Sequence, residues 1–237
     1  MHINNGNPAS PGAFLRAEPE RFRGWMLRQQ GNLVVFCVMA IVFGAGSYGA
    51  AMGWWRAPLQ AFYTGIKLPL VILLTTLGNG LLNGMLAPLL GLNVNFRQSL
   101  ALVLMSFAMT AMVLGALSPV ALFIVWNTPP LAAGTTISSP EYALLQLTLA
   151  VFVALAGIMG NLRLMPLLRE WAGNAAVARN VLLAWLAGNL FLGSQICWVL
   201  RPFIWEANRP VEFIGQHCFQ GSFFETVFTA LCRLIFS

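Results

Sequence analysis

LPLVILLTTLGNGLLNGMLAPLLG, residues 68–91, is an unbroken run of apolar and small polar residues without a single Lys, Arg, Asp or Glu. A helix rises 1.5 Å per residue, so this run reaches the ~20 residues that cross about 30 Å of hydrocarbon. A helix on the surface of a soluble protein would carry a charged face, which this run lacks. We therefore expect residues 68–91 to span a membrane.

Four more runs in the chain have the same character. Each is long enough to cross the hydrocarbon, and tryptophans lie near several of their ends, where interfacial anchors are expected. The runs are 32–54, 99–125, 140–162 and 177–200, and the tryptophans are Trp54, Trp55, Trp126, Trp171 and Trp205. The sequence therefore predicts an all-α, polytopic transmembrane bundle of about five helices, occupying residues 32–200.

The composition excludes a soluble protein. Charged residues make up 8% of the chain, whereas roughly 25% is typical of soluble domains. The net charge of +6 comes mostly from basic residues that flank the apolar runs, where they act as topology signals and contacts to anionic head groups. No dense basic cluster or nucleic-acid-binding motif is present. The expected partner is the lipid bilayer, and nucleic acid is not expected.

The two ends of the chain differ from the middle. Residues 1–31 begin with a polar stretch and continue with aromatic residues interleaved with arginines, which is typical of a segment lying in the membrane surface. Residues 201–237 contain a polar connection and then SFFETVFTALCRLIF, residues 222–236. This last stretch is too short to span and carries Glu225 and Arg233, so we expect a short amphipathic or re-entrant helix.

The distribution of Lys and Arg predicts the orientation. With the N-terminus inside, the inner segments hold eight basic residues and the outer segments hold five. The outer five are Arg56, Lys67, Arg201, Arg209 and Arg233. The positive-inside rule therefore predicts a cytoplasmic N-terminus and, for five spans, a C-terminus on the other side.

Catalytic and metal-binding signatures are missing from the sequence. The four cysteines form no CxxC pair, and the two histidines, His2 and His217, lie in the terminal segments. A metal site, an attached haem and Ser-His catalysis are therefore not expected, and neither is a bound cofactor. No acidic residue lies at depth in a predicted span, which argues against a proton relay. Cys218 and Cys232 can pair if the C-terminus faces an oxidising compartment.

Polar side chains inside the predicted spans are the candidate functional residues. Thr75, Asn79 and Asn83 are spaced four apart and so share one helical face. Because polar groups in lipid need partners, this face should meet other helices or a wet cavity. The other candidates are Ser106, Thr110, Asn189, Ser194 and Gln195. Two interpretations stay open: these residues join helices, or they line a polar path between the second, third and fifth spans.

Small residues recur at the same spacing in other runs. Such faces allow close helix packing and indicate a tight bundle or an oligomer. They comprise Ala45, Gly49 and Gly53, then Ala156 and Gly160, then Ser106 and Thr110. Pro119, deep in the third run, predicts a kink or break and a freed carbonyl that needs a partner.

The end of the fifth run carries a recognisable pattern. Residues 193–203 read GSQICWVLRPF, followed by NRPVEF at 208–213 and GSFFE at 221–225. This pattern, over about residues 188–226, resembles a group of uncharacterised polytopic bacterial membrane proteins whose last span ends in GSQxxWxLRPF. The resemblance implies a bacterial inner-membrane location and supplies candidate functional or assembly residues: Gln195, Trp198, Arg201, Pro202, Phe203 and Glu225. The layout also resembles the Yip1-type five-helix membrane proteins, although the first-span motif of that family is absent.

Together these features predict a non-enzymatic integral membrane subunit that packs with itself or with partner membrane proteins. The alternative is a small channel or transporter with a path between the second, third and fifth spans.

Overall fold

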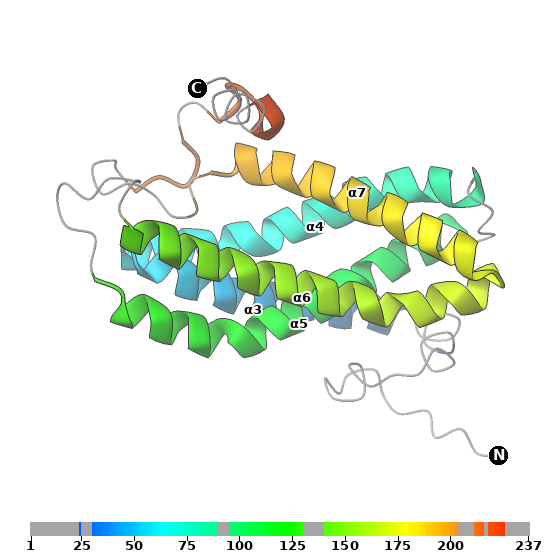
Figure 1. Cartoon of the computed structure of the whole chain (residues 1–237), viewed down its shortest axis with the longest axis horizontal. Helices are drawn as coiled ribbons and strands as arrows, with labels where there is room; N and C mark the ends of the chain where they lie inside the picture. The colour runs from blue at the N-terminus through cyan, green and yellow to red at the C-terminus, as the bar shows by residue number, and fades with distance from the viewer. Residues whose placement is uncertain are drawn as a thin grey trace, which may run out of the picture.

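The structure, a computed structural model, describes residues 24, 30–89, 95–129, 140–201, 203, 211–215 and 218–225. Within these residues the regular elements are all helices. They run side by side along the long axis of the molecule (Figure 1). Their bounds are α3 Gln30–Trp54, α4 Pro58–Leu89, α5 Phe96–Asn127, α6 Pro140–Ala172 and α7 Ala175–Val199. All five are long and apolar enough to cross a membrane. The predicted all-α, multi-pass architecture is therefore confirmed.

Two helices extend beyond the predicted runs. α4 begins at Pro58, ten residues before the predicted start at residue 68, and so includes Lys67. α6 continues to Ala172, ten residues past the predicted end at 162. Lys67, which the sequence analysis counts in an outer segment between two predicted spans, lies inside α4 and is fully buried. Side chains in both extensions are buried, among them Gln60 and Thr64 of α4 and Leu168 of α6.

The predicted terminal segments fall mostly outside the described residues. This applies to nearly all of the N-terminal segment 1–31 and to most of the predicted C-terminal helix at 222–236. Residues 223–225 are helical and lie near the end of α7 (Figure 1).

α3 packs closely against both α4 and α5. A Cβ at Gly49 would lie 2.5 Å from the carbonyl oxygen of Thr64 in α4, and a Cβ at Gly44 would overlap the Ala111 carbonyl of α5. Backbones this close leave no room for a side chain, which is the role expected of small residues between membrane helices. The small-residue face predicted around Gly49 is therefore an internal packing face.

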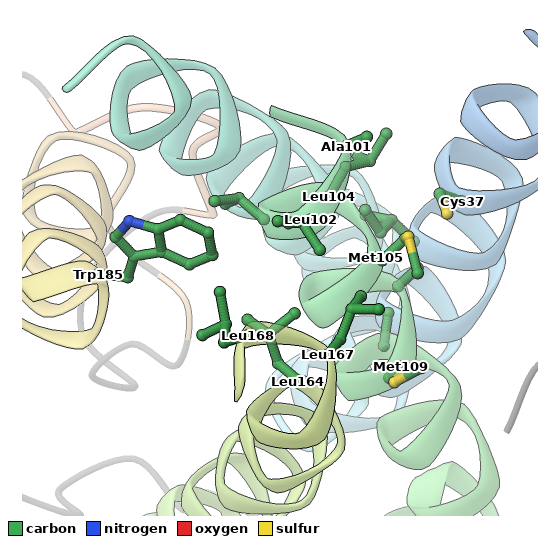
Figure 2. Packing of buried hydrophobic residues seen from close by; sticks show 14 of the residues in the cluster. Cys37, Ala101, Leu102, Leu104, Met105, Met109, Leu164, Leu167, Leu168 and Trp185 are labelled. Carbon is green, nitrogen blue, oxygen red and sulfur yellow. The ribbon is translucent and has the colours of Figure 1, made fainter. Parts of the chain in front are cut away.

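Two clusters of buried apolar side chains join the helices. In the first, Trp185 points inward from α7 toward Leu102 of α5 and Leu168 of α6 (Figure 2), and all three side chains are buried. In the second, the Tyr48 hydroxyl of α3 donates a hydrogen bond to the backbone oxygen of Leu149 in α6, at 2.7 Å. α6 and α7 lie at the periphery, because only 22% of the residues in the most apolar stretch of each helix are buried, against 61% for α5.

α5 passes through Pro119 without a break. Proline cannot donate to the carbonyl four residues earlier, which belongs to Gly115. The Ser118 hydroxyl donates to that oxygen instead, at 2.8 Å. The Gly115 carbonyl, which Pro119 leaves without a backbone donor, thus has a hydrogen-bond partner, as the sequence predicts. The helix is continuous to Asn127.

The turn between α6 and α7 is set by two residues. Gly173 has a φ of +62°, the left-handed conformation that commonly ends a helix. Asn174 then caps α7, because its Oδ1 accepts a hydrogen bond from the backbone N–H of Ala176 at 2.8 Å. This two-residue connection makes α6 and α7 antiparallel neighbours.

Candidate functional site

The polar face of α4 lies against α7. Asn79 Nδ2 donates to the backbone oxygen of Trp185 at 3.2 Å and also to Oδ1 of Asn189. Thr75 lies opposite Gly193, because a Cβ at Gly193 would be 3.6 Å from Thr75 Oγ1. We call Thr75, Asn79 and Asn83, which share one face of α4, together with Asn189 of α7 the polar seam of the bundle.

Several polar atoms of this region are buried without a hydrogen-bond partner in the described part of the chain. They include both side-chain amide atoms of Asn83, Oδ1 of Asn79 and Oγ1 of Thr75. The side chains of Asn79 and Asn83 are 0% exposed. A buried polar group without a partner costs about 1–3 kcal/mol. The polar seam therefore holds more hydrogen-bonding capacity than its own contacts use.

The polar seam is closed by close packing. A Cβ at Gly188 would overlap Oδ1 of Asn79, so the α7 backbone lies directly on the Asn79 amide. Gly188 leaves space for that amide, and the hydrogen bond to Asn189 holds it there. In this conformation α4 and α7 touch rather than flank an open passage.

Ser106 and Thr110 belong to another interface. The Ser106 hydroxyl donates to Oδ1 of Asn161 in α6 at 3.3 Å, and a Cβ at Gly160 would overlap Oγ1 of Thr110. These contacts join α5 to α6. The structure therefore places Thr75 and Asn79 against α7, with Asn83 buried on the same face of α4, whereas Ser106 and Thr110 lie in a different interface.

The remaining polar candidates on α7 lie toward the end of that helix. Ser194 is half-buried and donates to the backbone oxygen of Phe191 in its own helix at 3.1 Å. Gln195 is also half-buried, and its Oε1 has no partner among the described residues. Within the described part of the chain, Ser194 and Gln195 make no side-chain hydrogen bond to α4, whereas Asn189 does.

The residues after α7 fold back over the end of the bundle. The Arg201 guanidinium stacks on Trp198, 3.7 Å from the ring centroid. Trp198 Nε1 and Arg201 Nη2 each donate to the backbone oxygen of Gln220 at 3.3 Å. The backbone N–H of Glu225 donates to Ser222 Oγ at 3.1 Å. Pro202 lies outside the described residues.

A second polar group was missed from the sequence. Gln60, Thr64 and Lys67 lie on one face of α4, and all three are 0% exposed. Gln60 Nε2 donates to the backbone oxygen of Phe203 at 2.8 Å, and Lys67 Nζ lies over the Phe203 and Phe213 rings. The sequence signal that could have identified this group is the spacing of residues 60, 64 and 67, which places them on one face of a helix. Lys67 is the notable member, because a charged residue inside a membrane helix is usually functional.

The described residues contain no group of three or more His, Cys, Asp or Glu side chains placed to hold a metal ion. Cys218 has a free thiol, and Cys232 lies outside the described residues. Comparisons of the chain with protein-family models, with curated proteins and with solved structures give no match.

Replacing the two asparagines of α4 by leucine should change stability in opposite directions. Asn79→Leu removes two hydrogen bonds and leaves Asn189 without its partner, so we expect a loss of about 1–2 kcal/mol. Asn83→Leu removes two buried atoms without partners, so the stability should rise or stay within about 0.5 kcal/mol. Unfolding of both variants in the same detergent measures the difference.

A large loss of stability from Asn83→Leu would contradict the closed seam. It would show that the Asn83 amide binds water or another ligand in the membrane.

Proposed function

We propose that this protein is a non-enzymatic integral membrane subunit that assembles with itself or with partner membrane proteins. The observation that carries the proposal is an open small-residue strip on the exposed side of α6. Ala150 and Ala154 are exposed, and Gly157 follows on the same face with no atom within 4 Å of the position of a Cβ. Strips of this kind allow another helix to approach closely.

The other small-residue faces are occupied within the chain. Gly49 packs on α4, Gly44 packs on α5, and Gly160 packs on the Ser106–Thr110 turn of α5. The strip on α6 is different, because the bundle leaves it uncovered. Beside it stands a ridge of exposed apolar side chains, which another apolar helix can cover without burying charge: Leu144, Leu147, Leu155, Ile158 and Leu162.

We further propose the bacterial inner membrane, with a cytoplasmic N-terminus, as the location. The resemblance of residues 193–203 to the GSQxxWxLRPF pattern supports the inner-membrane location. The charge bias of the sequence, eight basic residues on the inner side against five on the outer side, supports the orientation.

Gly157→Leu should weaken assembly without harming the fold. Among the described residues, no atom lies within 4 Å of the new Cβ, but the side chain fills the space that a second helix would use. Native mass spectrometry of gently extracted protein, with crosslinking in native membranes, measures the assembled fraction. We expect that fraction to fall severalfold, while the unfolding midpoint changes little.

The matched control is Leu77→Ala, a change at an exposed position on α4, which carries neither the small-residue strip nor the apolar ridge beside it. It should leave assembly close to the parent level. Recovery of monomer alone from both the parent protein and Gly157→Leu would refute the proposal.

The alternative function, a small channel or transporter, is favoured by one observation. The atoms without partners in Thr75, Asn79 and Asn83 lie along one seam, and water entering between α4 and α7 would satisfy them. The path would then use the second and fifth spans, with Ser106 and Thr110 of the third span turned toward α6.

A reversible crosslink tests this alternative. Gly193 Cβ would lie 3.6 Å from Thr75 Oγ1, so Thr75→Cys/Gly193→Cys places two thiols within reach of a disulfide. In liposomes, with the four native cysteines replaced by alanine, flux of ions or small solutes should stop on oxidation and return on reduction. Flux that stays the same after oxidation, or the absence of flux from folded reduced protein, would exclude a path through the polar seam.

A further inference from the structure

The face formed by Gln60, Thr64 and Lys67 is separate from the polar seam and has a different chemistry. These residues follow one another at intervals of four and three, so they stand one above the other on α4. Lys67 lies nine residues into the helix, about 14 Å along its axis from Pro58. Its ammonium group is fully buried at this depth, where a charge is costly without a specific environment.

The donors of this face converge on a single oxygen atom. Gln60 Nε2 donates to the backbone oxygen of Phe203 at 2.8 Å, and the Thr64 hydroxyl lies 3.2 Å from the same oxygen. The Thr64 hydroxyl is also 2.8 Å from the backbone oxygen of Gln60, to which it can donate instead. The oxygen of Phe203, which is 139 residues from Thr64 in sequence, thus occupies an acceptor position formed by α4.

The rings of the same segment cover the lysine. Lys67 Nζ lies 5.8 Å from the centroid of Phe203 and 5.2 Å from that of Phe213, both within the range of a cation–π contact. Phe213 is held in place edge-on by Tyr63 of α4, with ring centroids 5.3 Å apart. A Cβ at Gly53 of α3 would lie 2.6 Å from the backbone oxygen of Gln60 and 2.7 Å from Thr64 Oγ1, so α3 also packs tightly against these residues.

We propose that Gln60, Thr64 and Lys67 form a binding site for a phosphate group, which Phe203 and Phe213 cover in this conformation. An ammonium, an amide N–H and a hydroxyl are donors suited to phosphate oxygens. The Phe203 carbonyl oxygen now takes the place of one such oxygen. Moving Phe203 and Phe213 aside exposes the donors at the end of the bundle where α4 begins and α7 ends.

The phosphate can come from a lipid head group or from a soluble ion, and both sources present the same oxygens. The test uses the full chain with two probes. Native mass spectrometry of protein from vesicles of equal phosphatidylcholine and phosphatidylglycerol records retained anionic lipid, and titration with inorganic phosphate in detergent records the free ion.

Phe213→Ala removes one covering ring, so it should raise binding of at least one probe severalfold. In that background, Lys67→Met should reduce binding by roughly tenfold or more, because a charged hydrogen bond is lost. Gln60→Leu in the same background removes a second donor and should also weaken binding, which keeps the test valid if Lys67→Met fails to fold. Phe219→Ala, which removes an aromatic residue that is 83% exposed, is the matched control and should bind like the parent.

Retention of phosphatidylglycerol alone identifies a lipid head group as the ligand, and binding of inorganic phosphate alone identifies a soluble ion. The proposal is overturned if Phe213→Ala binds neither probe better than Phe219→Ala does. It is also overturned if binding survives the loss of both Lys67 and Gln60.

Discussion

The structure depends on one constraint: a polar group at membrane depth is costly unless it finds a partner inside the protein. The Tyr48 hydroxyl reaches a backbone oxygen of α6, Asn79 reaches α7, and Ser118 replaces the donor that Pro119 lacks. These bonds are possible because the helices lie very close together, with Gly44 and Gly188 at the tightest contacts. The small residues therefore allow the close helix packing that brings the buried polar groups within hydrogen-bonding distance of their partners.

Most of the fold could be predicted from the sequence, because a long run of apolar residues identifies a helix that lies in lipid rather than in water. Five apolar runs gave the five helices and their order. The first turns of α4 were missed for a physical reason. Residues 58–67 contain Gln60, Thr64 and Lys67, which read locally as a polar connection. They are buried because Phe203 and Phe213, far away in sequence, fold over them.

The candidate site was predictable only in part. The four-residue spacing of Thr75, Asn79 and Asn83 was enough to place them on one face, but which helix covers that face depends on the packing of the whole bundle. α7 covers this face, and Asn189 accepts a hydrogen bond from Asn79. Ser106 instead donates a hydrogen bond to Asn161 of α6. The two polar groups of α4 thus have separate neighbours. One joins α4 to α7, and the other joins α4 to the segment after α7.

The central claim is that the polar face of α4 is sealed against α7 while the opposite face meets lipid. Single spin labels at residues 77, 79, 81 and 83, in a background with the four native cysteines replaced by alanine, test it directly in vesicles. Leu77 and Leu81 are more than half exposed, so labels there should respond to oxygen, which dissolves in lipid. Labels at 79 and 83 should respond weakly both to oxygen and to a water-soluble nickel complex. A strong nickel response at 79 and 83 would contradict the sealed bundle and show that water enters between α4 and α7.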